Sequence, residues 1–128
     1  MLSISKQTDY AIELILALSK LREGELLSLR TFSKHSNISF LFLQRIARSL
    51  RGAQLIESVR GMNGGYRLVK PAQRISFREV IEAIEGKFGV IACSKNSMCQ
   101  FEMRCSAKHR LRVVEREIVQ LLGERFVA

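Results

Sequence analysis

A glycine-rich turn between two short alternating runs is the feature that most constrains how this chain can fold. The runs occupy residues 56–60 and 66–70, and the residues between them read Gly-Met-Asn-Gly-Gly. Glycine adopts positive φ angles at little steric cost, so this pattern predicts a β-hairpin. A phosphate-binding loop is excluded, because the turn lacks a Gly-Lys-Ser/Thr ending and no helical pattern follows it directly.

Two helical patterns precede the hairpin. The first covers residues 28–35, with Ser28 as the expected N-cap, and the second covers residues 39–50. Apolar side chains fall on one face of the second helix, and a Ser-Asn turn joins the two helices. Two short helices with a tight turn predict a helix-turn-helix, and the hairpin that follows makes the whole a winged helix.

Positive charge is concentrated on this winged helix. The chain has 21 Lys and Arg against 12 Asp and Glu, a net charge of +9. Residues 27–70 hold eight basic side chains and one acidic one, Glu57, and so account for +7 of that total. Such a concentration favours a nucleic acid as the partner, because each neutralised phosphate releases counterions. Together with the winged helix, it predicts binding to double-stranded DNA. A solvated surface of scattered Lys and Arg is the alternative.

The second helix of a winged helix enters the major groove of DNA with its N-terminal half. With the apolar face turned inward, the side chains expected to face DNA are Ser39, Gln44, Arg45 and Arg48. Gln reads adenine through two hydrogen bonds, and Arg binds guanine or phosphate. Phe40 and Phe42 are candidates for contact with a thymine methyl group, and we expect at least one of them to pack in the core instead.

Three arginines in and beside the hairpin have expected roles of their own. Arg60 stands at the base of the wing, where an arginine can enter a narrow, A·T-rich minor groove. Arg51 and Arg67 are expected to contact phosphates, which position a protein on DNA without specifying its sequence.

Three further helices complete the predicted fold, at residues 8–21, 77–85 and 107–126. The second of these has Ser76 as its cap and ends at Gly86. We expect a mainly α chain with a small β-hairpin wing. Its expected parts are a winged helix-turn-helix DNA-binding domain at 1–86, a cysteine segment at 87–106 and a dimerisation helix at 107–128.

The last helix carries a narrow apolar stripe. Leu111, Val114, Ile118 and Leu121 are spaced by three, four and three residues, which is typical of a coiled-coil seam. The stripe can pack back on the first helix or against a second copy of the chain. We favour a homodimer, because winged-helix proteins commonly bind two DNA half-sites by two-fold symmetry.

The three cysteines form a regular constellation. Cys93, Cys99 and Cys105 are each separated by five residues, whereas structural zinc sites usually pair cysteines two to four residues apart. Thiolates suit iron, so the spacing favours an iron–sulfur cluster, with Asp9 and His109 as candidate fourth ligands. Three free thiols, or one redox disulfide and a remaining thiol, are the alternative.

The order of these motifs resembles the Rrf2 family of transcription regulators. The wing reads Arg-Gly-x-x-Gly-Gly-Tyr-Arg-Leu from Arg60, the cysteines follow as Cys-x5-Cys-x5-Cys, and a long helix comes last. The resemblance implies a homodimeric winged-helix repressor or activator whose cluster lies beside the dimer helix. Members of the family respond to iron–sulfur supply, nitric oxide or iron.

The resemblance also implies a ligand set. Cys93, Cys99 and Cys105 match the three cysteine ligands of the family. In members whose sequence begins like residues 6–11 of this chain, an Asp matching Asp9 supplies the fourth ligand to a 4Fe–4S cluster from the other subunit. Other members bind a 2Fe–2S cluster with a His three residues after the last cysteine, where this chain has Lys108, and His109 comes one place later. We therefore place 4Fe–4S ahead of 2Fe–2S.

Two residues that are expected to contact DNA bases can also be compared with the matching positions of the family. Arg60 matches the minor-groove arginine of the family. Gln44 stands where some members carry a base-reading Glu, which implies a different operator preference.

The sequence thus predicts a cytosolic DNA-binding regulator, expected to repress, that senses iron–sulfur, nitric-oxide, iron or redox status. The alternatives are a cluster-free or zinc-containing DNA-binding regulator, and an interaction module that regulates an enzyme. We expect no enzyme, because the sequence has no nucleophile–base–acid set and no Walker motif. We also expect no membrane partner, because the start does not resemble a signal peptide and the longest apolar run, 14–18, is too short to cross a bilayer.

Overall fold

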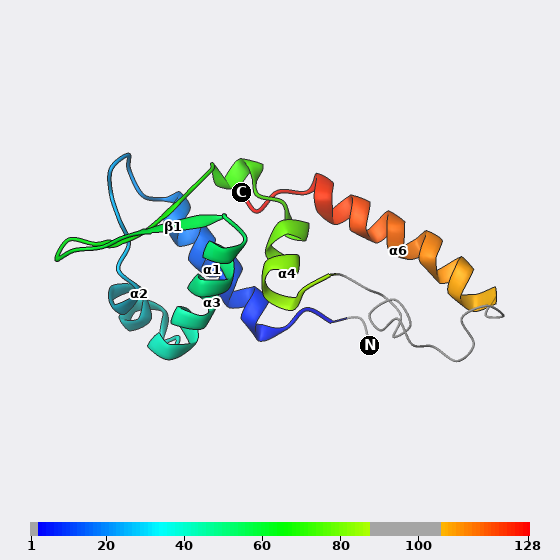
Figure 1. Cartoon of the computed structure of the whole chain (residues 1–128), viewed down its shortest axis with the longest axis horizontal. Helices are drawn as coiled ribbons and strands as arrows, with labels where there is room; N and C mark the ends of the chain where they lie inside the picture. Colours follow the sequence, from blue (N-terminus) through cyan, green and yellow to red (C-terminus); the bar gives the residue numbers. More distant parts are fainter. Residues whose placement is uncertain (1–2, 88–105) are drawn as a thin grey trace.

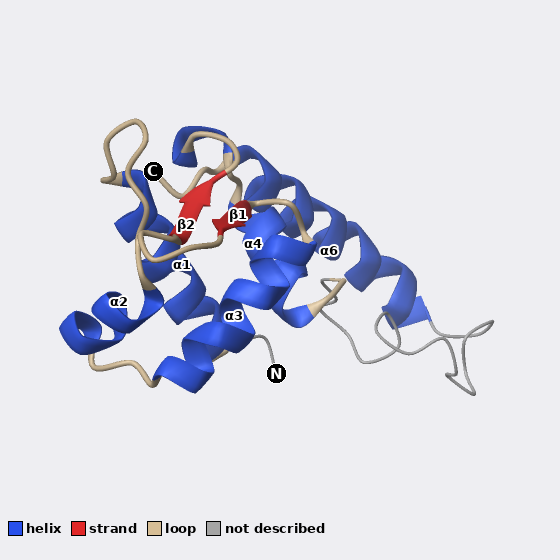
Figure 2. Cartoon of the chain, turned by 60° about the vertical axis from the view of Figure 1, so that its left-hand side comes forward, coloured by secondary structure: helices blue, strands red, loops and turns tan. Residues whose placement is uncertain are grey.

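The structure, a computed structural model, describes residues 3–87 and 106–128. Its elements in chain order are α1 (Lys6–Ser19), α2 (Leu29–Ser36), α3 (Phe40–Gly52), β1 (Ile56–Val59), β2 (Gly65–Leu68), the 3-10 helix η1 (Ala72–Arg74), α4 (Phe77–Glu85) and α6 (Ser106–Glu124). The hairpin of β1 and β2 projects from one side of the helices in Figure 1, and α6 slants away from the other helices in both views (Figures 1 and 2). The mainly helical fold with a two-stranded wing is as the sequence predicted.

Local capping signals explain where the helices begin and end. At α4 the predicted limits are confirmed, because Ser76 Oγ accepts the Glu79 N–H at 3.2 Å and the Glu79 carboxylate accepts the Ser76 N–H at 2.8 Å. The expected start of the first helix at residue 8 was two residues late, because Ser5 is the N-cap of α1. Ser28 occupies the N-cap position of α2, but its side chain makes no capping hydrogen bond.

The core is built around α1, which packs on α3, α4, η1 and β2. Leu14 and Ile15 of α1 are fully buried, together with Leu43 and Leu50 of α3. The apolar face of α3 that the sequence predicted is therefore the face that enters the core, and it fixes the rotation of this helix about its axis.

The wing is an antiparallel hairpin with a close backbone contact near its turn, at the start of β2. Leu27 and Tyr66 exchange two backbone hydrogen bonds of 2.9 Å, so the chain before α2 lies along β2. Gly65 makes this approach possible, because a Cβ atom there would lie 2.6 Å from the Leu27 carbonyl oxygen. In the turn, Gly61 has a φ of 129°, which L side chains rarely adopt.

The C-terminal helix and tail return to α4. Helix α6 packs on α4, and the tail forms backbone hydrogen bonds with the start of α4: Phe77 N–H to the Arg125 carbonyl at 3.0 Å and Val127 N–H to the Ile75 carbonyl at 2.9 Å. Of the predicted seam, Leu111, Val114 and Leu121 are exposed. Within the described residues, no helix is both long and apolar enough to cross a membrane.

Glu79 joins the end of the wing to α4. Its carboxylate accepts hydrogen bonds from Lys70 Nζ and from the Ser76 N–H. Burial raises the pKa of Glu79, but the hydrogen bonds from Lys70 and Ser76 and the positive charge of Lys70 outweigh it. Together they hold the pKa of this carboxyl below its ordinary value of 4.5.

The contact at Gly65 gives a test of the wing. Gly65→Ala should lower the free energy of unfolding by about 1–3 kcal/mol, because the new methyl group overlaps a backbone carbonyl that cannot move alone. Gly52→Ala is the matched control, since a Cβ there meets nothing within 4 Å. Urea denaturation of both variants measures the effect, and equal stabilities would contradict the close contact.

The lowered pKa of Glu79 predicts a pH dependence of stability. A carboxyl whose pKa is lower in the folded state contributes stability above its unfolded pKa, near 4.5, and loses that contribution as the pH falls through the folded value. Glu79→Gln should therefore flatten the decline of stability below pH 4.5. The charge-matched control is Glu82→Gln on the same helix, and identical profiles for the two variants would contradict this role of Glu79.

Candidate nucleic-acid interface

Helix α3 presents an exposed stripe opposite its buried one. Side chains at positions i, i+3, i+4 and i+7 of a helix lie on one face. The exposed stripe of α3 follows this spacing and consists of Leu41, Gln44, Arg45 and Arg48. Burial of the opposite side turns these four side chains outward together.

The exposed stripe lines an open concavity of about 440 Å³ between α3 and the wing. Arg51 at the end of α3 and Tyr66 of β2 complete the lining. Arg51 Nη1 also donates a hydrogen bond to Ser58 Oγ of β1 at 3.3 Å, which ties the end of the helix to the hairpin. We refer to this site, lined by Leu41, Gln44, Arg45, Arg48, Arg51 and Tyr66, as the α3–wing concavity.

The charge of the α3–wing concavity is of one sign. Arg45, Arg48 and Arg51 contribute three guanidinium groups, and no carboxylate stands among its lining residues. Gln44 adds an amide that can both donate and accept hydrogen bonds. Positive side chains that line one hollow attract an anion more strongly than the same charges on a flat surface.

Two aromatic side chains of α3 pack beside the stripe. The Phe42 ring meets the Tyr10 ring edge-to-face with centroids 5.5 Å apart, and Arg30 lies over the Phe40 ring at 4.7 Å. Both phenylalanines are partly buried against the core. Neither of them lines the concavity, whereas Leu41 does.

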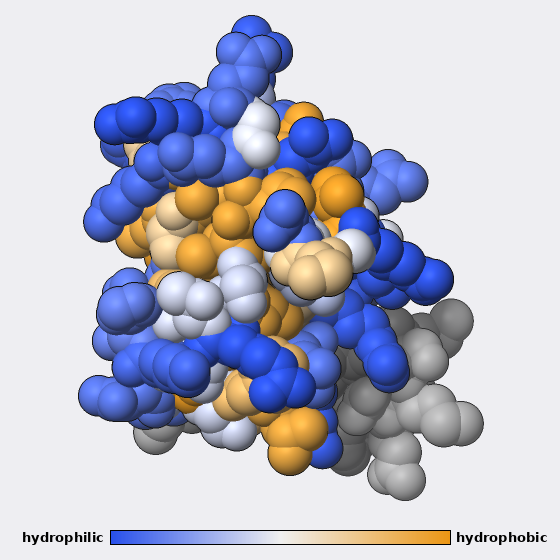
Figure 3. Space-filling view, turned by 90° about the vertical axis from the view of Figure 1, so that its left-hand side faces the viewer, coloured by the Kyte–Doolittle hydropathy of each residue, from blue (hydrophilic) through white to orange (hydrophobic). Residues whose placement is uncertain are grey.

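Two further predicted contact residues, Ser39 and Arg60, are exposed but do not line the concavity. Ser39 is exposed at the N-cap of α3, where its side chain makes no capping hydrogen bond. Arg60 is exposed directly after β1, so it lies at the start of the wing turn and not at the base of the wing, where it was expected. Figure 3 views this end of the molecule, where hydrophilic side chains surround a central area of apolar ones.

Arg67 is a predicted contact residue that lines a different hollow. It pairs with Glu57 directly across the hairpin, Nε to Oε1 at 2.5 Å. Neighbouring residues of a strand point to opposite faces. Tyr66 therefore faces the concavity, and Arg67 faces a second hollow beyond the wing.

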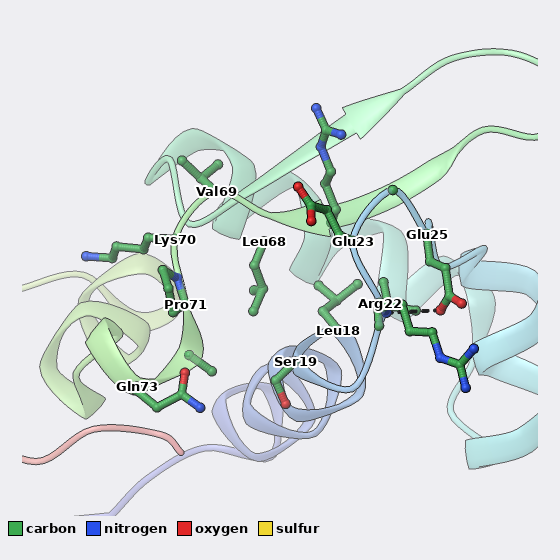
Figure 4. A pocket seen from close by; sticks show the side chains of 14 residues that line it. Leu18, Ser19, Arg22, Glu23, Glu25, Leu68, Val69, Lys70, Pro71 and Gln73 are labelled. Carbon is green, nitrogen blue, oxygen red and sulfur yellow. Dashed lines mark hydrogen bonds between the residues drawn. The ribbon is translucent and has the colours of Figure 1, made fainter.

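This second hollow has about 570 Å³ between the end of α1, the chain after it and the segment from β2 to η1. Leu18 and Leu68 stand in its interior, and charged side chains of both signs surround them (Figure 4). The Arg22 N–H donates to the Glu25 carboxylate at 3.1 Å there. The hollow is larger than the α3–wing concavity, but its charges are mixed, so it does not select an anion.

The predicted cluster ligands fall mostly outside the described residues. Cys93, Cys99 and Cys105 lie within 88–105, so the structure does not test their arrangement. Asp9 is exposed in the first turn of α1, and His109 is exposed near the start of α6. Both views of the chain show the starts of these two helices well apart (Figures 1 and 2). Asp9 and His109 thus belong to two helices whose starts lie apart.

Two residues that line the α3–wing concavity were not predicted from the sequence: Leu41 and Tyr66. Leu41 is apolar, whereas the side chains expected on the exposed face were polar ones. The signal was nevertheless present, because Leu41 precedes Gln44, Arg45 and Arg48 by three, four and seven positions. Tyr66 carried no such signal, since its approach to α3 depends on how the hairpin folds back.

Comparison with known proteins agrees with this geometry. A family model described as Rrf2, iron-dependent transcriptional regulator, matches residues 4–128. The structure of CymR (YrzC), the global cysteine regulator of B. subtilis, superposes with a TM-score of 0.78 and 24% sequence identity, covering 99% of this chain and 94% of that one. These findings identify the fold as that of winged-helix regulators, and the chain belongs to the Rrf2 family.

Two curated relatives fall in the same family. The chain is 40% identical over 86 residues to the regulator IscR of Cereibacter sphaeroides, a match that covers 66% of this chain and 56% of IscR. It is 27% identical over 110 residues to the regulator NsrR of Oceanobacillus iheyensis, covering 84% of this chain and 75% of NsrR. The Rrf2 family consists of transcriptional regulators, which agrees with the expectation that this chain is not an enzyme.

Proposed function

We propose that this chain is a DNA-binding transcriptional repressor that reads double-stranded DNA with the exposed stripe of α3. The observation that carries the proposal is the α3–wing concavity, where three arginines and a glutamine share one hollow. An α-helix fits the major groove, and Gln and Arg are the side chains that recognise adenine and guanine there. The many basic residues outside the stripe suit the DNA backbone.

The proposed contacts fall into two kinds. Gln44 and Arg45 read base edges, while Ser39, Arg48 and Arg51 bind at the edge of the groove, mostly to phosphates. Arg60 enters the minor groove beside the wing. Arg67 contacts a phosphate from the flank of the wing, in competition with its pairing to Glu57.

The proposed assembly is a homodimer through α6. The exposure of Leu111, Val114 and Leu121 supports it, because these apolar side chains lie along one stripe of α6 and are open to a partner. Such a dimer would present two copies of α3 to two half-sites of DNA.

The proposed sensor is an iron–sulfur cluster held by Cys93, Cys99 and Cys105. Thiolate sulfur is the donor that iron–sulfur clusters require, and the relatives IscR and NsrR belong to the same family. Asp9 is the proposed fourth ligand, from the second copy of the chain, because its exposed carboxylate stands at the start of α1; this choice favours 4Fe–4S over 2Fe–2S. A bound cluster would supply chemistry that responds to nitric oxide, iron supply or redox state.

Helix α4 is the proposed connection between the sensor and the DNA-binding elements. The cysteine segment follows directly after Glu85, whose carboxylate accepts a hydrogen bond from the Ser5 N–H at 2.7 Å. At the other end of α4, Glu79 binds Lys70 at the end of the wing. A change in the cysteine segment alters DNA affinity only if these contacts differ between two states of the protein. We place the protein in the cytosol.

Single substitutions distinguish base reading from phosphate binding. Gln44→Ala should reduce the preference for one base pair by about 1–3 kcal/mol. Arg48→Ala should instead weaken binding to all duplexes and reduce the slope of log affinity against log salt concentration by about one. Arg74→Ala, an exposed arginine on η1, is the charge-matched control. Fluorescence anisotropy at several salt concentrations measures the affinities. Equal losses in all three variants would contradict the proposed interface.

Purification without oxygen tests the sensor. The wild-type protein should absorb visible light and contain iron. Cys99→Ala and Asp9→Ala should lose most of the bound iron, whereas His109→Ala should keep it. Iron analysis and absorption spectra provide the measurement. A colourless protein that binds zinc would contradict the cluster and favour the zinc-containing regulator. A protein that takes up no iron after reconstitution with iron and sulfide would favour the cluster-free regulator.

A further inference from the structure

Leu41 is an apolar side chain in an otherwise polar stripe. Its side chain is 72% exposed, and among the described large apolar residues only Met62 at the wing turn is more exposed. An isolated exposed leucine is common on protein surfaces and needs no explanation by itself. What sets Leu41 apart is its place in the α3–wing concavity, on the same helical stripe as Gln44, Arg45 and Arg48.

Packing among the described residues, 3–87 and 106–128, does not account for this leucine. Its neighbours Phe40 and Phe42 turn to the two sides of the helix and pack against the core, as described above. A helix of period 3.6 turns Leu41 directly away from the buried stripe of Leu43, Ile46, Ala47 and Leu50. The apolar surface of Leu41 is therefore left open to a partner that enters the concavity.

In the major groove of DNA, one group complements such a side chain. The edges of guanine, cytosine and adenine present hydrogen-bond donors and acceptors, while thymine adds an apolar C5-methyl group. We infer that Leu41 contacts a thymine methyl group and thereby specifies thymine at one position of each half-site. This inference rests on the proposed function, since it requires the exposed stripe of α3 to enter the major groove.

The position of that thymine relative to the base read by Gln44 follows from helix geometry. Leu41 and Gln44 are three residues apart on one stripe, about 4.5 Å along the helix axis at about 1.5 Å per residue. Consecutive base pairs are about 3.4 Å apart. The thymine that Leu41 contacts should therefore be next to the base pair that Gln44 reads, which predicts two adjacent A·T pairs in the half-site.

Replacement of thymine by deoxyuridine isolates the methyl group. Duplexes selected from a random library by the full chain are synthesised with one thymine at a time replaced by deoxyuridine, which leaves every hydrogen-bonding group in place. One position in the half-site should lose affinity by about fourfold, the effect of burying one methyl group. At that position Leu41→Ala should bind the two duplexes equally, while Leu41→Met should retain part of the preference.

Met62→Ala is the control, because Met62 is also exposed and apolar but lies on the wing turn outside the concavity. This variant should discriminate thymine from deoxyuridine as the wild type does. The inference is overturned if no deoxyuridine substitution weakens the wild type, or if Leu41→Ala keeps the discrimination. If the random library yields no bound duplex at all, the proposed function itself fails, and the inference fails with it.

Discussion

The burial of one stripe of α3 is the constraint on which the rest of this molecule depends. Leu43 and Leu50 are fully buried against a core built on α1, and each such side chain contributes about 1.5–3 kcal/mol through removal from water. A helix is rigid about its axis, so burial of this stripe also determines which side chains face outward. The opposite stripe combines Leu41, Gln44 and Arg48 for that reason. The packing that stabilises the fold thus also exposes the stripe that is proposed to contact DNA.

The wing and α4 complete this arrangement from two sides. Close backbone contact between Gly65 and Leu27 holds the wing on the core, so that Tyr66 closes the α3–wing concavity. Helix α4 packs on α1, α3 and α6. Because the cysteine segment lies between α4 and α6 in the chain and α4 packs on α3, α4 is the element through which the proposed sensor would reach α3.

Local signals in the sequence were sufficient for most of the fold. The limits of α4 follow from a capping box and a terminal glycine, and the wing follows from its glycine-rich turn, because both depend on residues close together in the chain. Features that join distant segments were harder to predict from the sequence. The return of the C-terminal tail to Ile75 and the pairing of Leu27 with Tyr66 join distant segments, and the exposure of Leu41 depends on which face of α3 meets the core.

Amide hydrogen exchange of the full chain, with and without a tightly bound duplex, tests the central claim most directly. If the exposed stripe of α3 and the wing form the DNA interface, the duplex should slow exchange in the turn before α3, in the first turns of that helix and at residues 60–65. Exchange along α6 should stay unchanged. Slowed exchange on α6, with none in α3 or the wing, would contradict the claim and assign the interface to another face.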